Sequence, residues 1–105
     1  MERLFDTQQF DAVLGVNEVF AVTAMKIAQK RGLSIPENMS FIGFTDGILS
    51  RYTTPTLTTV AQHGFKMGEI AARMLIAKLE ETENDESVKT EVIKTSLIER
   101  ESTRR

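Results

Sequence analysis

Two apolar strands flanking one helix, all within residues 12–44, constrain the fold of this chain more than any other feature. Residues 12–16 (AVLGV) are apolar and include two β-branched residues, which predicts a strand buried on both faces, as in a parallel sheet. Apolar residues then recur at helical spacing over residues 18–31, and residues 39–44 (MSFIGF) predict a second buried strand. We therefore expect an α/β fold built on a β-α-β unit, with two adjacent parallel strands.

The residues at both ends of the predicted helix are those that favour helix ends. Asn17 can cap the first turn, and Glu18 is favourable beside the positive end of the helix dipole. Lys30 and Arg31 suit the negative end, and Gly32 tolerates the left-handed backbone that closes many helices. The helix is therefore expected to begin after Asn17 and to end near Gly32.

The rest of the chain predicts further short elements without internal repeats. They are the end of a helix at 2–9, an extended segment at 55–60, a long helix at 62–80, an acid-rich loop at 80–87 and a final strand at 91–99. Gly64 and Gly68 lower helix propensity, so the long helix either starts later than residue 62 or has a close neighbour there.

Composition narrows the functional classes. A chain of 105 residues with 41% apolar and 27% charged residues fits one globular unit, and no apolar run approaches the roughly 20 residues of a membrane helix. The chain has no cysteine, and its single histidine, His63, has no metal-ligand spacing, so we expect no metal or cofactor. The chain has 13 basic and 15 acidic residues, so it has no excess of positive charge. This chain alone is therefore not expected to bind DNA tightly.

Five segments, in this order and spacing, resemble the lactose-repressor/galactose-repressor family of bacterial transcriptional regulators. They are residues 11–18 (DAVLGVNE) with Ala21, 32–37 (GLSIPE), 40–46 (SFIGFTD), 55–60 (PTLTTV) with Gln62, and the closing 100–103 (REST). Each segment is weak alone, but the ordered set spans almost the whole chain. The resemblance implies the C-terminal part of an effector-binding domain.

The resemblance also implies an architecture. The family's core has two lobes like those of periplasmic sugar-binding proteins, each with a parallel sheet between helix layers. Residues 1–60 and 92–105 would belong to the lobe distal from DNA, and residues 61–91 would carry the helix that crosses to the DNA-proximal lobe. In the family, DNA is contacted only through a helix-turn-helix head. That head is absent from this sequence. If the chain stands alone, apolar surface built for missing strands is expected to be exposed, and self-association becomes an expected outcome.

Four polar residues are the candidate effector-binding side chains. Ligands of α/β sheets bind beyond the carboxyl ends of strands, where Asn17, Thr45 and Asp46 are expected. In the family the asparagine bonds effector hydroxyls, Gln62 matches a position near the cleft, and Thr45 replaces a common aspartate. That replacement leaves open either a neutral sugar or an anionic ligand. The alternatives are that Asn17 only caps its helix, that Asp46 only fixes its loop, and that backbone groups satisfy Gln62.

A second set of residues matches the family's dimer surface on the distal lobe. For these side chains, and for Val22 in particular, packing within the lobe is the alternative. The set consists of Val22, Ile48, Leu49, Tyr52 and Thr53.

We therefore expect a cytoplasmic, non-enzymatic sensor that forms a homodimer and binds a small molecule, a sugar or sugar derivative, to modulate operator binding. One rival is a periplasmic solute-binding protein, which the REST ending disfavours. The other is a small glycoside hydrolase with Glu18 and Asp46 as paired carboxylates, supported only by their expected strand-end positions.

Overall fold

The computed structural model describes residues 2–81 and 88–103, and these fall into two compact units. The first unit comprises residues 1–61 and 96–105, and the second comprises residues 62–95. Most of the predicted acidic loop, residues 82–87, lies outside the described residues. The elements of the first unit are α1 (Glu2–Thr7), β1 (Ala12–Gly15), α2 (Glu18–Lys30), β2 (Ser40–Phe44), α3 (Leu49–Tyr52), β3 (Thr58–Ala61) and β4 (Ser96–Ile98).

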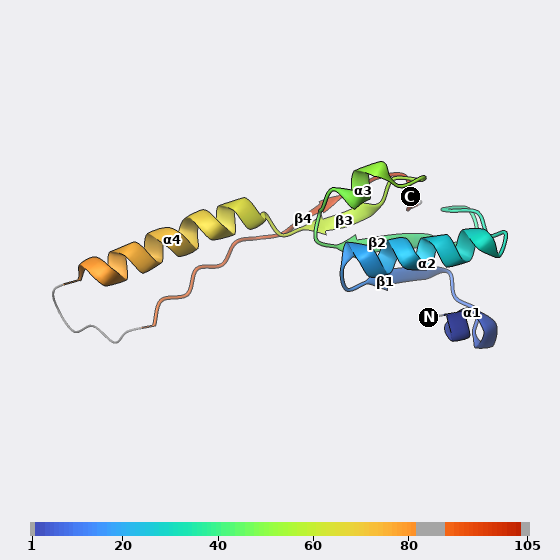
Figure 1. Cartoon of the computed structure of the whole chain (residues 1–105), viewed down its shortest axis with the longest axis horizontal. Coiled ribbons are helices and arrows are strands. Elements are labelled where there is room, and N and C mark those ends of the chain that lie inside the picture. The colour runs from blue at the N-terminus through green and yellow to red at the C-terminus, as the bar shows by residue number, and fades with distance from the viewer. Residues whose placement is uncertain (1, 82–87, 104–105) are drawn as a thin grey trace. The chain divides into compact units, whose positions relative to one another are not determined.

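The sheet of the first unit has the order β1-β2-β3-β4 (Figure 1). β1 pairs with β2 in parallel, with Ala12 opposite Ser40, and β2 pairs with β3 in parallel, with Ile42 opposite Thr58. The predicted β-α-β unit is therefore confirmed. The final strand is shorter than predicted, and it pairs with β3 in the antiparallel sense, an orientation that its sequence did not indicate.

The helix α2 lies close to the sheet because its inward face is small. Its buried residues are Ala21, Ala24, Met25 and Ala28, and they form the core with Met39, Phe41 and Leu57. A Cβ atom at Gly15 would lie 2.7 Å from the backbone nitrogen of Ala21, a distance that real structures do not tolerate. A glycine in β1 is therefore required for this close approach of helix to strand.

Both predicted ends of α2 are confirmed. Asn17 is the N-cap, and its side-chain oxygen accepts a hydrogen bond from the backbone N–H of Phe20 at 2.9 Å. Gly32 follows the last turn with φ of 81°, in the left-handed region.

The prediction that residues 12–16 are buried on both faces is wrong for this chain. Val13 and Gly15 face α2, but Leu14 is 67% exposed and Val16 is 73% exposed. Of the three layers of the expected fold, the described residues supply the sheet and α2 on one of its faces. This exposure agrees with the expectation that apolar surface is left uncovered when the chain stands alone.

The second unit contains α4 (Gly64–Glu80), which starts two residues later than predicted. Both Gly64 and Gly68 lie within α4, and an added Cβ at either would meet no atom within 4 Å, so no close neighbour explains these glycines. No residue of α4 is buried, and none of the described helices has the length and apolar character to cross a membrane.

Ser102 provides a test of how the C-terminal end stabilises the sheet. Its buried hydroxyl donates to the carbonyl of Phe41 at 2.6 Å and accepts from the N–H of Thr58 at 2.8 Å. Ser102→Ala leaves both backbone groups without this partner, so we expect a loss of about 2 kcal/mol in the free energy of unfolding, measured in urea. Ser34→Ala, at an exposed serine, is the control; equal stability of the two variants would contradict this role.

Candidate functional site

Two strand ends bring the predicted polar residues to one edge of the sheet. Asn17 follows β1, and Thr45 and Asp46 follow β2. Because the two strands are parallel and in register, their carboxyl ends lie side by side. Gln62 lies in the second unit, after β3, and is described with that unit.

The amide of Asn17 has two separable functional groups. Its oxygen caps α2, as the alternative interpretation expected. Its Nδ2 donates no hydrogen bond to any residue within 2–81 or 88–103, and the side chain is only partly buried. Capping and ligand contact are therefore compatible, since an amide has two donors in addition to its acceptor oxygen.

Thr45 has an unusual backbone conformation. Its φ is 79°, in the left-handed region that β-branched residues rarely adopt, and its N–H donates to the carbonyl of Val60 on β3 at 3.0 Å. Such a conformation costs on the order of 1–3 kcal/mol and persists only where surrounding contacts impose it. The turn after β2 is therefore held in place by its neighbours.

Asp46 supplies the main contact that holds this turn. One of its oxygens accepts from Arg100 at 2.7 Å and from the hydroxyl of Thr59 at 2.8 Å, and Arg51 lies 3.7 Å from the other oxygen. Burial opposes ionisation of the carboxyl group, but these hydrogen bonds and the two guanidinium charges outweigh it and hold the pKa of Asp46 below its ordinary value. The ion pair is largely buried, with side chains 14% and 16% exposed for Arg100 and Asp46.

The ending at residues 100–103 has a structural role that sequence reasoning missed. Besides contacting Asp46, Arg100 donates to the carbonyl of Leu57 at 2.7 Å. Glu101 accepts from the N–H and hydroxyl of Thr56, which lowers the pKa of Glu101. The hydroxyl of Thr103 lies 2.8 Å from that of Thr58. The only signal in the sequence was a cluster of four polar residues, and polar clusters are usually solvated.

Glu18 is also occupied by structural contacts. Its carboxylate accepts from the buried hydroxyl of Ser50 at 2.9 Å and lies against Gly47, where an added Cβ would overlap it. It therefore connects the start of α2 to the turn after β2. Arg100 and Thr59 hold Asp46 in place, and the lowered pKa of its carboxyl group disfavours the protonated form that an acid catalyst needs. Within the described residues, no group of three acidic or histidine side chains could hold a metal ion.

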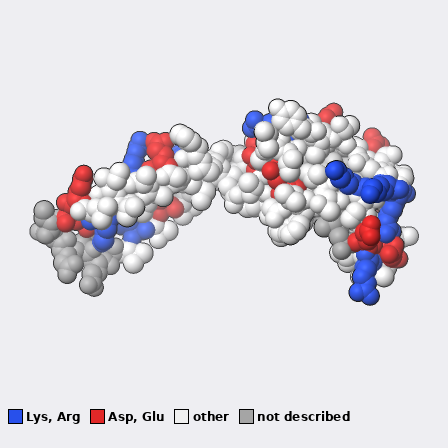
Figure 2. All heavy atoms as spheres, in the orientation of Figure 1, with Lys and Arg blue, Asp and Glu red and all other residues white. Residues whose placement is uncertain are grey.

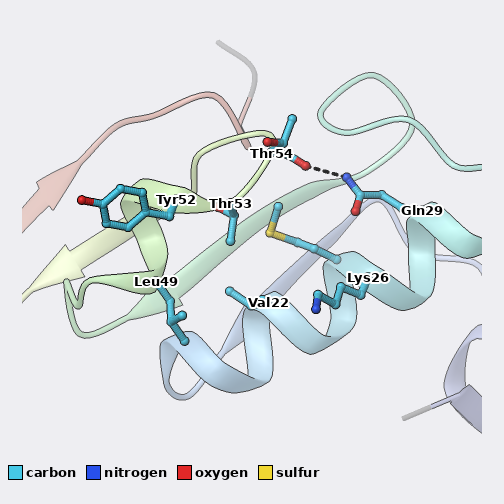
Figure 3. Close-up of a pocket in the computed structure, with 8 residues that line it drawn as sticks. Val22, Lys26, Gln29, Leu49, Tyr52, Thr53 and Thr54 are labelled. Atoms are coloured by element: carbon cyan, nitrogen blue, oxygen red, sulfur yellow. Dashed lines mark hydrogen bonds between the residues drawn. The ribbon is translucent and has the colours of Figure 1, made fainter.

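All of the predicted dimer residues except Ile48 line a groove between α2 and α3. The groove has a volume of about 400 Å³ and is lined in part by Val22, Leu49, Tyr52 and Thr53. Figure 3 shows Val22 on α2 facing Thr53, whereas Tyr52 projects from α3 away from α2. Tyr52 is 80% exposed and Ile48 is 69% exposed, so packing within the unit does not account for them. Val22 is half-buried against the core, which agrees in part with the alternative that it packs within its own lobe.

The model of the periplasmic binding protein-like domain family matches residues 2–103. The chain belongs to this family. Curated relatives and solved structures confirm two predictions, the resemblance to lactose-repressor-type regulators and the fold.

Two curated relatives are transcription regulators. The helix-turn-helix-type transcriptional regulator RegA of Clostridium saccharobutylicum is 34% identical over 91% of this chain, and the ribose operon repressor of Haemophilus influenzae is 32% identical over 87%. The chain spans 28% and 27% of their respective lengths.

Two solved structures of LacI-family regulators are also similar to this chain. A LacI-family regulator from Sanguibacter keddieii is 31% identical with a TM-score of 0.86, covering 96% of this chain and 38% of its own. A LacI-family regulator from Arthrobacter sp. FB24, solved in complex with lactose, is 28% identical with a TM-score of 0.84, covering 98% of this chain and 39% of its own.

The ion pair at Asp46 predicts a pH dependence with a defined sign. Because the pKa of Asp46 in the folded chain lies below the ordinary aspartate value of 3.8, ionised Asp46 stabilises the fold fully above that pH, and the contribution is lost as the pH falls through the folded pKa. Asp46→Asn should lower the free energy of unfolding by roughly 2 kcal/mol at pH 7. The difference from wild type, measured by urea unfolding, should shrink towards pH 3; a pH-independent difference would contradict this account.

Proposed function

We propose that this chain is the effector-sensing and dimerising part of a LacI-type transcriptional regulator. The observation that carries the proposal is the pairing of Asn17 and Thr45 at adjacent strand ends, in a chain that belongs to the periplasmic binding protein-like family. A small molecule bound there would favour one arrangement of two lobes, and that preference would change operator affinity.

The chemistry of this sheet edge suits a ligand rich in hydroxyl groups. The Asn17 amide can donate, and the hydroxyl of Thr45 can donate or accept without introducing charge. We assign Asp46 mainly to holding the turn, since Arg100 and Thr59 already share one of its oxygens. Gln62 is also proposed as an effector-binding residue. A sugar or sugar derivative fits this set, and the absence of a carboxylate at residue 45 permits an anionic sugar derivative.

The two units are proposed to belong to different lobes. Residues 1–60 and 92–105 would form part of the lobe distal from DNA, and residues 61–91 would carry the helix that crosses to the DNA-proximal lobe. DNA contact would come from a helix-turn-helix segment that these 105 residues do not contain. Relatives such as RegA are named as helix-turn-helix-type regulators, which supports this assignment.

Dimerisation through the α2/α3 surface is also proposed. The exposed side chains of Ile48, Leu49 and Tyr52 stand beside the groove at Val22 and Thr53, and an exposed apolar surface of this kind is typical of an interface. A cytoplasmic, non-enzymatic regulator fits these features. The relatives described above are regulators, which favours this role over solute transport or glycoside hydrolysis.

Asn17 allows the proposed function to be tested by substitution. Residues 2–103 would replace the matched segment of the Arthrobacter regulator, and lactose, ribose and ribose 5-phosphate would be titrated by calorimetry. If the amide contacts ligand, Asn17→Ala should weaken binding of the recognised sugar by about 1–3 kcal/mol, roughly 5- to 150-fold. Asn17→Asp, the matched control, should keep the melting temperature close to that of wild type because both residues cap well.

Two outcomes would contradict the proposal. If the chimera folds but binds none of the three sugars, the proposal that this sheet edge accepts sugars of these kinds is contradicted. If the affinity is unchanged in both variants, while only Asn17→Ala loses stability, Asn17 is a structural cap alone.

A further inference from the structure

The two candidate ligand-binding residues lie just beyond the paired part of the sheet. Pairing between β1 and β2 ends with Gly15 opposite Gly43, so Asn17 and Thr45 each follow two residues after the last pair. The N–H of Thr45 donates to the carbonyl of Val60, and this bond holds Thr45 to β3 and not to β1. A contact other than the pairing of β1 with β2 is therefore needed to fix the separation between Asn17 and Thr45.

Glu18, the residue after Asn17, makes such a contact with the turn that follows β2. It is the first residue of α2, and its Cα would lie 3.5 Å from a Cβ added at Gly43, so the helix starts directly over β2. A Cβ added at Gly47 would overlap the carboxylate of Glu18, so this carboxylate packs on the backbone of Gly47. Glu18 thus bridges the residues that follow β1 and those that follow β2.

A buried serine of α3 fixes the orientation of this carboxylate. The hydroxyl of Ser50 donates to Oε2 of Glu18 at 2.9 Å, and Ser50 is fully buried. The carbonyl of Ser50 accepts from the N–H of Leu57 at 2.9 Å, so the serine is itself held in place. Contacts from Ser50 and Gly47 restrict the Glu18 side chain from two directions.

The bridge lies at the surface of the first unit, on the side of the candidate site. Figure 2 shows acidic atoms (red) on the first unit near where Figure 1 draws α3 above the start of α2. Glu18 and Asn17 are partly buried, and Thr45 is exposed. A ligand can therefore reach the residues beside the bridge without displacing the core.

The residue after Ser50 supports the other strand end. Arg51 lies 3.7 Å from Asp46, which follows Thr45, although this contact is weaker because the Arg51 side chain is 65% exposed. Two consecutive residues of α3 therefore contact the residue after Asn17 and the residue after Thr45. The short helix α3 is a common support for both strand ends.

We propose that Glu18 is a positioning residue for the effector site. Its carboxylate, held by Ser50 and Gly47, keeps the ends of β1 and β2 at the separation that one bound sugar needs. This inference rests on the proposed function, because it concerns the same sheet edge. A site that already has its bound geometry loses less conformational entropy on binding. Glu18 thus acts through Asn17 and does not itself contact the ligand.

The experiment measures sugar binding by the chimera described above. Lactose, ribose and ribose 5-phosphate are titrated by calorimetry, and the sugar that wild type binds most tightly is then used for the variants. Glu18→Ala and Ser50→Ala should each raise its dissociation constant about tenfold, because binding must then order the loosened strand ends. Gly47→Ala should do the same, since the added methyl group displaces the carboxylate without removing a charge or a hydrogen-bonding group.

Two control variants separate positioning from charge and from stability. Glu18→Gln keeps the side-chain length and an acceptor oxygen for Ser50, so its dissociation constant should stay within about threefold of that of wild type. Met39→Val reduces a buried side chain just before β2, at the end of the strand opposite Thr45. This variant should lower the urea midpoint and leave the dissociation constant within about twofold.

A double-mutant cycle with Asn17 tests whether Glu18 acts through this residue. Once the amide is removed, its position no longer affects binding. Glu18→Ala should therefore raise the dissociation constant of the Asn17→Ala chimera by less than about threefold, against about tenfold in the wild-type background. A purely structural role would give the same factor in both backgrounds.

The outcomes distinguish this inference from the proposed function. The inference would be overturned by equal factors in the two backgrounds, by unchanged affinity in Glu18→Ala and Ser50→Ala, or by an equal loss of affinity in Met39→Val. In each of these cases the sugar binding of wild type would still support the proposed function. A wild-type chimera that folds but binds none of the three sugars would contradict the proposed function, and this inference with it.

Discussion

The contact between Arg100 and Asp46 ties the C-terminal end of this chain to the turn that carries its candidate site. The guanidinium group of Arg100 donates to Asp46, to the carbonyl of Leu57 and to the hydroxyl of Thr59, so one side chain connects the C-terminal segment both to the turn after β2 and to residues 57–59. Its charge is compensated by a carboxylate 2.7 Å away, and removing either partner would leave a largely buried, unpaired charge.

The site depends on this contact through the turn after β2. Thr45 is held in a left-handed conformation that its side chain disfavours, with Asp46 anchored on one side and its own N–H bonded to Val60 on the other. Residues 100–103 also bond to β2 and β3, through Ser102 in particular. The position of the Thr45 side chain thus depends on Arg100, more than 50 positions away in the sequence.

Sequence reasoning succeeded where the determinants are local. The β-α-β unit, the cap at Asn17 and the left-handed Gly32 follow from residues within one turn of each other, and all three are confirmed. It failed for the exposure of Leu14, because an apolar strand has the same sequence whether or not a neighbour covers its second face. It left the direction of β4 open, since strand orientation depends on partners distant in sequence.

The candidate site was predictable only in outline. The resemblance identified Asn17, Thr45 and Asp46, and the structure places them at neighbouring strand ends. The role of Arg100 could not be derived, because a terminal Arg-Glu-Ser-Thr sequence does not reveal which carboxylate or carbonyl it meets. That information depends on tertiary contacts between segments about 40 to 60 residues apart, such as Arg100 with Leu57 and Ser102 with Phe41.

A double-mutant cycle between Arg100 and Asp46 tests the central claim most directly. The free energies of unfolding of wild type, Arg100→Met, Asp46→Asn and the double variant would be measured in urea at pH 7. A contact that organises the turn predicts a coupling energy of about 2 kcal/mol, with the double variant little less stable than either single variant. Additive losses, with a coupling below roughly 0.5 kcal/mol, would show that the two residues act independently and would contradict this account.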